Sequence, residues 1–398
     1  MTAPTASPVA GMLQKHWIKE QTTFDTIVAY AATDAVEGRV GAFKIDGEKN
    51  FEELMEAVGT ASHQGDVALD RGGKFSIQTN IKPAAAGTAP DIGPAGLKAC
   101  FGAEGIVGST SVTYTFSDTV KVPLQGALNI ASGLQHVFSG GVVTDWEIDI
   151  PGNGVPTITI NGEFARFGWA YRDVIGVGGV ATSATSCPLD NDSRGCVYPG
   201  AVVMLGDDSG TASAGYTVTG YTDTTGSAAF AFSPGLAGAG EAAGLLITPL
   251  VPSSTVGGTA IAAVNCGLTI DSVPLGFIKA NIKGTTGWGL RSGEATTDRA
   301  SGIVRVGKRK VEGSLDFWFL DANTGNAPIL GRTWEGTIRD IALRVGENTT
   351  GKRMTIDINK ARLMVPTFDI GEAAVQASVS FLAQQNAAAA DECIVSFT

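Results

Sequence analysis

The chain has 398 residues, of which 43% are hydrophobic, so it can bury one large core or two modest ones, which excludes an intrinsically disordered protein. The formal net charge of -11 argues against tight binding of DNA or RNA by the chain as a whole, because affinity for phosphates comes mainly from Lys and Arg. Charged residues make up only 17%, and Thr, Val, Ile and aromatic residues cluster in short alternating stretches rich in Gly, which predicts a mainly β fold.

The first hundred residues contain the only helices that the sequence predicts. Residues 1–21 are expected to form a mobile N-terminal arm, and residues 23–45 a first pair of strands. Asn50 is a candidate helix N-cap, with acidic residues in the first turn that follows. That short helix would bury one side, made of Phe51, Leu54 and Val58. A second short helix is expected from residue 91 to 101, with a buried edge of Leu97, Cys100 and Phe101.

Strand alternation with a period of two is explicit in three later segments. They are residues 112–116, 311–319 and 375–383, in each of which apolar residues alternate with polar ones. Such segments are typical of half-buried strands with one face in water. A closing strand is predicted at residues 393–397.

A five-residue pattern occurs twice, 198 residues apart. Residues 157–161 read TITIN and residues 355–359 read TIDIN, and each copy follows a turn that contains Gly. Asp145 and Asp340 occupy matching places in the alternating runs before the two turns. The pattern predicts two long β-hairpins built on one plan.

The composition changes between residues 173 and 270, where Gly, Ala, Ser and Thr dominate. Short β-like runs separated by Gly predict a small β-sandwich or barrel inserted into a host domain. The predicted domains are therefore an arm (1–21), the first half of a core (22–172), an inserted outer β domain (173–272) and the second half of the core (273–398).

Five cysteines with irregular spacing fit a reducing compartment better than a disulfide framework, and they form no zinc pattern. A bond between Cys187 and Cys196 stays open. The N-terminus lacks the charged start and apolar core of a signal peptide, and the longest uncharged stretch, 242–270, is broken by prolines. We therefore expect a soluble protein.

No motif for catalysis or cofactor binding is complete. Residues 346–352 nearly spell a phosphate-binding loop, but Arg353 stands where Ser or Thr should hold magnesium and a strand is predicted to follow. The three histidines have no evident partner for a catalytic triad. A calcium site at residues 190–192 is a weaker reading than a plain surface loop. We expect no enzyme activity, no cofactor and no metal.

The acidic row formed by Asp145, Glu147 and Asp149 is the strongest local signal. Alternation with Trp146 and two isoleucines places the three carboxylates on one strand face at two-residue steps, roughly 6.5 to 7 Å apart. Two such carboxylates could serve a glycosidase, but no cleft with aromatic platforms is evident. If copies of the chain joined in a ring, the wet faces would line a hole that keeps duplex DNA off its wall.

A basic cluster, residues 305–310, could reverse the overall negative charge on one face. The two interpretations are a solvated turn and a docking site for an acidic face of a neighbouring copy. The sequence favours the solvated turn.

The succession of several loose motifs resembles that of the major tail tube proteins of long-tailed bacteriophages. The motifs are KEQTTF at 19–24, GTAP at 87–90 leading into LKACFG at 97–102, GGVV at 140–143, VEGSL at 311–315 and the stretch 368–381. The resemblance implies a tail-tube-type β-sandwich with a flanking short helix. It also implies a structural virion protein whose rings, usually of six copies, stack into the phage tail tube through which genome DNA is ejected.

The resemblance further implies partners and a location. Tape-measure and tail terminator proteins would bind the tube, DNA would pass without specific binding, and the protein would be assembled in the host cytoplasm and reside in the virion. Candidates for the lumen or ring face are Asp145, Glu147, Asp149, Thr157, Thr159, Asp340, Thr355 and Asp357. The repeated hairpin leaves open a duplicated tube domain with three copies per ring, although each half looks short for a complete domain, which favours six. The alternative function is a carbohydrate-binding surface or adhesin-like β protein that binds through the insertion.

Overall fold

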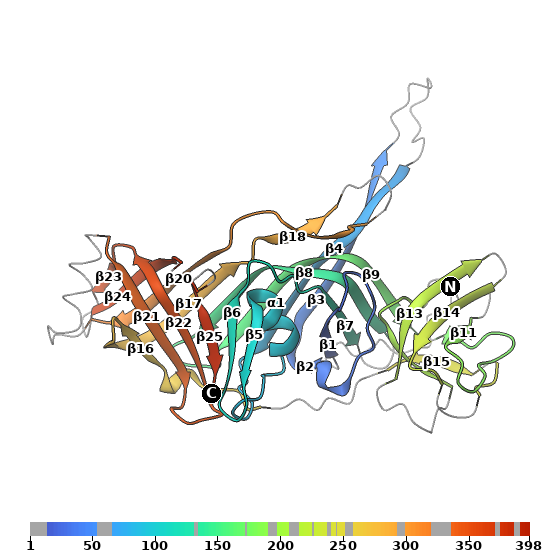
Figure 1. Cartoon of the computed structure of the whole chain (residues 1–398), viewed down its shortest axis with the longest axis horizontal. Helices are drawn as coiled ribbons and strands as arrows, with labels where there is room; N and C mark the ends of the chain where they lie inside the picture. The colour runs from blue at the N-terminus through green and yellow to red at the C-terminus, as the bar shows by residue number, and fades with distance from the viewer. Residues whose placement is uncertain are drawn as a thin grey trace, which may run out of the picture.

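A computed structural model describes residues 14–53, 66–130, 134–171, 173–189, 197–206, 215–224, 227–236, 240–243, 245–250, 258–292, 299–319, 336–370, 375–385 and 391–398. The described chain is mainly β, with antiparallel strands throughout (Figure 1). Its helical pieces are short: η1 (Ala32–Asp34), the π-helical turn η2 (Gly93–Leu97), α1 (Lys98–Phe101) and η3 (Ala263–Asn265).

The strands fall into three groups along the chain. The first part of the core contains β1 (Gln14–Glu20), β2 (Ala35–Val36), β3 (Gly38–Glu53), β4 (Asp66–Asn80), β5 (Gly102–Val107), β6 (Ser111–Phe116), β7 (Leu124–Ile130), β8 (Leu134–Ile150) and β9 (Thr157–Tyr171). The insertion contains β10 (Asp173–Val174), β11 (Ser186–Pro188), β12 (Val202–Leu205), β13 (Tyr216–Thr224), β14 (Ser227–Ser233) and β15 (Leu246–Pro249). The last part contains β16 (Gly267–Ile270), β17 (Val273–Thr285), β18 (Trp288–Arg291), β19 (Gly302–Arg305), β20 (Lys310–Trp318), β21 (Ile338–Gly346), β22 (Arg353–Leu363), β23 (Thr367–Ile370), β24 (Val375–Ala383) and β25 (Ile394–Phe397).

One run of pairings carries most of the core. It connects β3, β4, β9, β8, β17, β20, β24 and β23 in that spatial order, and we call these eight strands the long sheet. Along its strands, buried apolar residues alternate with polar ones, as Phe75 and Ile77 alternate with Ser76 and Gln78 on β4. The long sheet therefore has one apolar and one polar face.

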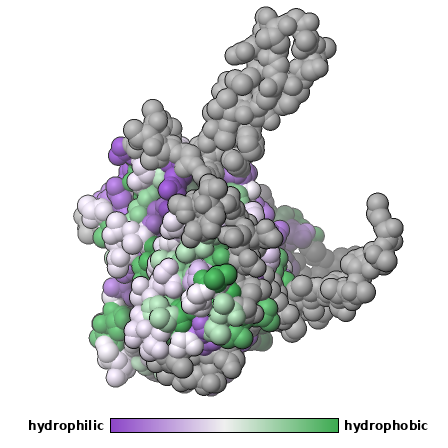
Figure 2. Space-filling model, turned by 90° about the vertical axis from the view of Figure 1, so that its right-hand side faces the viewer, coloured by the Kyte–Doolittle hydropathy of each residue, from purple (hydrophilic) through white to green (hydrophobic). Residues whose placement is uncertain are grey.

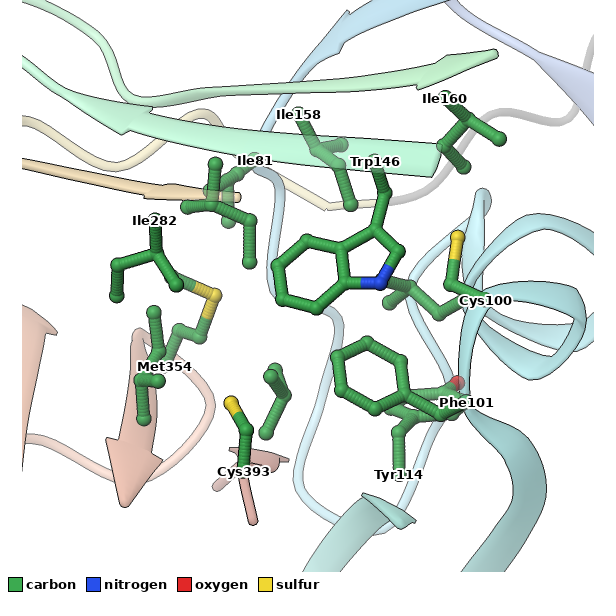
Figure 3. Packing of buried hydrophobic residues seen from close by; sticks show 14 of the residues in the cluster. Ile81, Cys100, Phe101, Tyr114, Trp146, Ile158, Ile160, Ile282, Met354 and Cys393 are labelled. Atoms are coloured by element: carbon green, nitrogen blue, oxygen red, sulfur yellow. The ribbon is translucent and has the colours of Figure 1, made fainter. Parts of the chain in front are cut away.

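A second run of pairings covers the apolar face. It connects β16, β21, β22, β25, β6 and β5, and we call it the facing sheet. Trp146 and Ile282 of the long sheet and Met354 of the facing sheet point into one core between the two sheets, beside Phe101 of α1 (Figure 3). The ring centroids of Phe101 and Trp146 lie 5.1 Å apart, so the short helix closes one side of the core.

Several predicted elements are confirmed. The predicted second helix appears as η2 and α1, and Leu97, Cys100 and Phe101 are buried. The three alternating segments are β6, β20 and β24, and the closing strand is β25. No described helix has the length and apolar content needed to cross a membrane.

Two predictions near the N-terminus are wrong. Residues 50–53 belong to strand β3, which pairs with β4, so Asn50 caps no helix; Leu54 and Val58 lie outside the described residues. Residues 14–20, predicted as part of a mobile arm, form β1 and pair along their whole length with β7. In both places, hydrogen bonding to a distant strand overrides the local signal.

The two predicted hairpins exist, but they do not share one position in the fold. The first is β8–β9 in the long sheet, and the second is β21–β22 in the facing sheet. Both send their apolar residues into the common core, Ile158 from the first and Ile356 from the second. Their polar rows therefore point away from the core on different sheets.

The insertion forms its own six-stranded sheet, in the order β10, β15, β12, β13, β14, β11, seen at the right of Figure 1. It ends earlier than predicted, because β16 pairs with β17 and β21 of the core although it precedes residue 272. Cys187 is a buried free thiol that donates to the carbonyl of Pro188, and Cys196 lies outside the described residues.

Two buried glutamines fasten neighbouring segments to the core by the same means. The side-chain amide of Gln125 accepts from the backbone N–H of Val28 at 2.8 Å and donates to its carbonyl at 2.5 Å. The amide of Gln135 does the same with Val202 of the insertion, at 2.6 and 3.4 Å. Each side chain thus binds a backbone N–H and carbonyl as a neighbouring strand would, and the insertion also shares a hydrophobic cluster with Trp17 and Tyr30.

Candidate assembly face

The acidic row is present as predicted on the polar face of the long sheet. Asp145 and Glu147 are half-buried and Asp149 is exposed, while Trp146, Ile148 and Ile150 between them are buried. Asp145 follows a bulge in the β8–β9 pairing and accepts from Asn161 Nδ2 at 2.7 Å. The row is therefore held by its own strand neighbours.

The neighbouring strand β17 partly neutralises the row, which the sequence did not indicate. Lys283 lies opposite Glu147, with Nζ 3.3 Å from the carboxylate, and Asn281 Nδ2 donates to Glu147 at 2.5 Å. A second lysine of the same strand, Lys279, lies 3.2 Å from Asp316 of β20. The alternation of Lys279, Asn281 and Lys283 with Ala280 and Ile282 is a readable strand signal, but nothing local says that this strand lies beside β8.

Across the whole long sheet the polar face stays net negative. Nine carboxylates of described residues lie on it, those of Asp46, Glu48, Asp145, Glu147, Asp149, Glu163, Glu312, Asp316 and Asp369. Five lysines lie on the same face, Lys44, Lys74, Lys279, Lys283 and Lys310. The charged side chains named here, which leave out the parts of β3 and β4 whose side chains the structure does not describe, therefore sum to a formal charge of -4.

The two threonines predicted beside the row differ from each other. Thr159 lies opposite Glu147 and is half-buried on the polar face. Thr157 lies opposite Asp149 but is only 6% exposed, so its side chain contributes little to a wet surface.

The candidates on the second hairpin lie elsewhere. Thr355 and Asp357 line a hollow of about 310 Å³ on the outer side of the facing sheet, together with Arg344 and Thr269. Burial, with the nearby Asp340 carboxylate, raises the pKa of Asp357; burial, with Asp271, raises that of Asp340. These residues do not join the row on β8, so one lumen wall cannot be made of both sets within one chain.

The positive charges of the basic cluster are largely paired with acidic residues of the same chain. Arg309 makes two contacts of 2.7 Å with Glu392 and one of 3.0 Å with Asp118, which also binds Arg305 at 3.3 Å. Arg309 also lies over the ring of Phe116, 4.4 Å from its centre. The cluster therefore stabilises the fold locally, and this weakens its interpretation as a docking site.

The remaining motifs carry no catalytic or metal chemistry among the described residues. Residues 347–352 form the turn between β21 and β22, with Lys352 3.5 Å from Glu347, as expected for a hairpin turn. His16 is buried, and burial lowers its pKa to about 4. In the described part of the chain no three His, Cys, Asp or Glu residues come together in a way that could hold a metal ion. Residues 190–192 lie outside it.

The long sheet ends in two edge strands. In the pairings of the described residues, β23 pairs only with β24, and β3 pairs only with β4. On β23, Phe368 is 44% exposed and Ile370 is 79% exposed, although both point to the apolar side of the sheet, opposite buried or half-buried residues of β24. An exposed edge with apolar side chains is a surface for pairing with another strand.

An aromatic row leads from the long hairpin to the insertion. Ring centroids lie 5.4 Å apart between Trp169 and Tyr198, and 6.3 Å apart between Tyr198 and Tyr221. A Cβ on Gly168 would overlap the ring of Tyr198, so this glycine permits their close approach. Trp169 is 39% exposed. Seen from the side of the insertion, hydrophobic and pale residues intermix below a more hydrophilic area (Figure 2).

No protein-family model matches the chain, and no curated protein matches it.

Proposed function

We propose that the protein is a structural subunit that assembles into stacked rings forming the tail tube of a long-tailed bacteriophage, with the polar face of the long sheet lining the lumen. The single observation that carries the proposal is the long sheet itself: one face is polar and net negative, and its edges β3 and β23 have no further partner among the described residues. Closing the sheet across subunits removes such edges.

The charge of the polar face supports a conduit for DNA. A wall with more carboxylates than lysines repels a polyanion, and the lysines of β17 are held in contacts with neighbouring acids, Lys283 with Glu147 and Lys279 with Asp316. Duplex DNA would therefore pass without specific binding. Of the residues named from sequence, we retain Asp145, Glu147, Asp149 and Thr159 for the lumen wall.

The proposed location is the virion, after assembly in the host cytoplasm. By the resemblance to tail tube proteins, tape-measure and terminator proteins are the expected partners. The inserted sheet would lie outside the tube wall.

Negative-stain microscopy of the purified full-length chain tests this proposal. At high concentration, or when seeded with preformed tail tubes, the chain is expected to form rings or hollow rods. A strictly monomeric protein under both conditions would refute it. Disassembly should not depend on chelators or reducing agents, since neither metal nor disulfide bonds are invoked.

A second candidate function is glycan binding, which the aromatic row favours. Aromatic rings that lie side by side offer flat apolar surfaces to the C–H faces of pyranose sugars. A neutral ligand also suits a chain of net charge -11 better than a nucleic acid does. Trp169→Ala should abolish binding of a neutral oligosaccharide such as maltoheptaose or chitohexaose, followed by tryptophan fluorescence.

Trp318→Ala is the matched control for that experiment. Trp318 is 40% exposed, almost the same fraction as Trp169, but it lies on β20, away from the insertion. Equal binding by both variants, or no binding by the unaltered chain, would rule the second function out.

A further inference from the structure

The long sheet consists of two halves with the same topology. In the first half, β3 pairs with β4, β4 with β9 and β9 with β8. In the second half, β17 pairs with β20, β20 with β24 and β24 with β23. Each half uses its strands in the same chain order, first, second, fourth, third. The last strand of the first half, β8, then pairs with the first strand of the second half, β17.

Once Ile370 is matched with Ile148, the registers of the pairings align the other residues of the two halves. On the last strand, Phe368 corresponds to Trp146 and Asp369 to Glu147. Ile370 corresponds to Ile148, an identical residue. An aromatic residue, an acid and an isoleucine thus stand in the same order at the same place.

A shared packing detail supports this alignment independently. A Cβ on Gly73 of β4 would lie 2.5 Å from the ring of Phe164 of β9 and would overlap the carbonyl of Asp46. A Cβ on Gly313 of β20 would lie 2.7 Å from the ring of Phe381 of β24 and would overlap the carbonyl of Asn281. In both halves, a glycine on the second strand admits a phenylalanine ring from the third strand of the sheet order.

Neighbouring core pairs differ in a compensating way. Phe75 lies opposite Gly162 in the first half, where Leu315 lies opposite Val379 in the second. Similarly, Ile77 lies opposite Ile160, where Phe317 lies opposite Ala377. In each comparison one member is larger and the other smaller, as expected when a core keeps its volume while its residues change.

This internal repeat differs from the one read in the sequence. The register gives residues 375–378 the role of residues 158–161, and does not give it to the similar pentapeptide 355–359, which lies in the facing sheet. The similarity between TITIN and TIDIN reflects strand composition rather than an equivalent position.

The two halves differ in one respect that bears on assembly. In the first half, Trp146 and Ile148 are each 1% exposed, with β17 beside them in the sheet and Phe101 of α1 packed on Trp146. The corresponding Phe368 and Ile370 of the second half lie on an edge and stay exposed. The next half of the sheet is one of the neighbours that cover the first pair. The equivalent neighbour for the second pair is the first half of another copy.

We infer that half of this chain is the repeating unit of the ring, that β23 of one copy pairs with β3 of the next as β8 pairs with β17, and that three copies close a ring. The inference rests on the proposed tube. Three copies supply 24 strands, which at a spacing of about 4.8 Å and a tilt of about 40° give a barrel about 48 Å across. Side chains of about 5 Å on each wall leave about 38 Å, sufficient for one hydrated duplex.

Six copies would supply twice as many strands and leave a channel of about 86 Å, far wider than one duplex needs. The sequence favours six whole chains per ring. Because the long sheet is duplicated within one chain, six half-sheets, and therefore three chains, take the place of six chains.

Cross-linking tests both the junction and the number. In the β8–β17 pairing, Glu147 lies opposite Lys283. Asp369 corresponds to Glu147 and Glu48 corresponds to Lys283, so the same register between β23 and β3 of the next copy places Asp369 opposite Glu48. Both residues are exposed, so the double variant Asp369→Cys with Glu48→Cys should fold normally. After oxidation of assembled rings, denaturing electrophoresis without reductant should give a ladder that ends at three chains. Each variant that carries only one of the two substitutions should give no ladder.

The mass of uncross-linked rings gives a second readout, expected at three times the 40.8 kDa of the chain. A ladder and mass at six copies would overturn the copy number while leaving the tube intact. Rings without a ladder would overturn the β23–β3 junction. Absence of any ring would instead overturn the proposed function itself.

Edge blocking supplies an independent variant. Ile370→Lys should abolish ring formation while leaving the melting temperature of the monomer unchanged, since the side chain is exposed. Val177→Lys is the control, because Val177 is an exposed aliphatic residue on the insertion. Rings formed equally by both variants would contradict the inference.

Discussion

Gly313→Ala should destabilise the folded chain, because the added methyl group has no room. It would meet the Phe381 ring at 2.7 Å and overlap the carbonyl of Asn281, a backbone atom that cannot turn away. Overpacking of this kind costs about 1–3 kcal/mol. The substitution also restricts the unfolded chain, which stabilises by up to about 1 kcal/mol wherever the native backbone tolerates Ala.

Gly302→Ala separates these two effects. Gly302 begins β19, and a Cβ there would meet no atom within 4 Å. It should therefore show only the gain from the unfolded chain. The difference in unfolding free energy between the two variants then measures the clash, at about 1–3 kcal/mol. Gly73→Ala should resemble Gly313→Ala, because it meets an equivalent ring and an equivalent carbonyl.

Urea-induced unfolding of the monomer, followed by tryptophan fluorescence, is the appropriate assay, with thermal melts as a second measurement. The midpoint should fall for Gly313→Ala and Gly73→Ala and stay or rise for Gly302→Ala. Equal midpoints for all three variants would refute the packing on which the equivalence of the two halves depends.

Three further predictions concern acid sensitivity, the insertion and ring closure. Burial lowers the pKa of His16 from 6.5 to about 4, so the unfolded chain binds its proton first; stability should fall as the pH drops from about 6.5 to about 4 and His16→Asn should flatten that slope in pH-dependent urea titrations. Gln135→Leu should leave the N–H of Val202 without its buried partner, at a cost of about 1–3 kcal/mol, whereas the carbonyl of Val202 keeps the N–H of Leu250 at 2.9 Å; the variant should speed proteolytic cleavage within the insertion, and unchanged cleavage would contradict this role. Glu48→Lys should increase ring formation, measured by light scattering, because it replaces a like-charge pair with Asp369 of the next copy by the opposite-charge arrangement seen between Glu147 and Lys283; weaker assembly would argue against the register.

Much of the fold follows from periodicity. The alternation of Val112, Tyr114 and Phe116 predicts which side of β6 is buried, and the structure buries all three. The acidic row on β8 follows from the same rule. Period-two alternation needs only local information, because successive side chains on a strand always point to opposite faces.

The failures have a different origin. Asn50 followed by two acids is a good local helix start, yet pairing with β4 determines the conformation there. The lysine opposite Glu147 and the exposure of Ile370 both depend on which strands are neighbours. Alternation along one strand does not indicate which strands pair with it. The partial neutralisation of the acidic row on β8 and the repeated topology of the long sheet were therefore visible only in the structure.

The amide of Gln135 has a consequence for the outline of the particle. The inserted domain is bound at both the N–H and the carbonyl of Val202 and shares apolar contacts with the core, so it is held rigidly rather than by a flexible linker. On a tube, every inserted domain would then have the same orientation relative to the wall. Averaged electron-microscopy images should therefore resolve these outer domains as sharply as the tube wall.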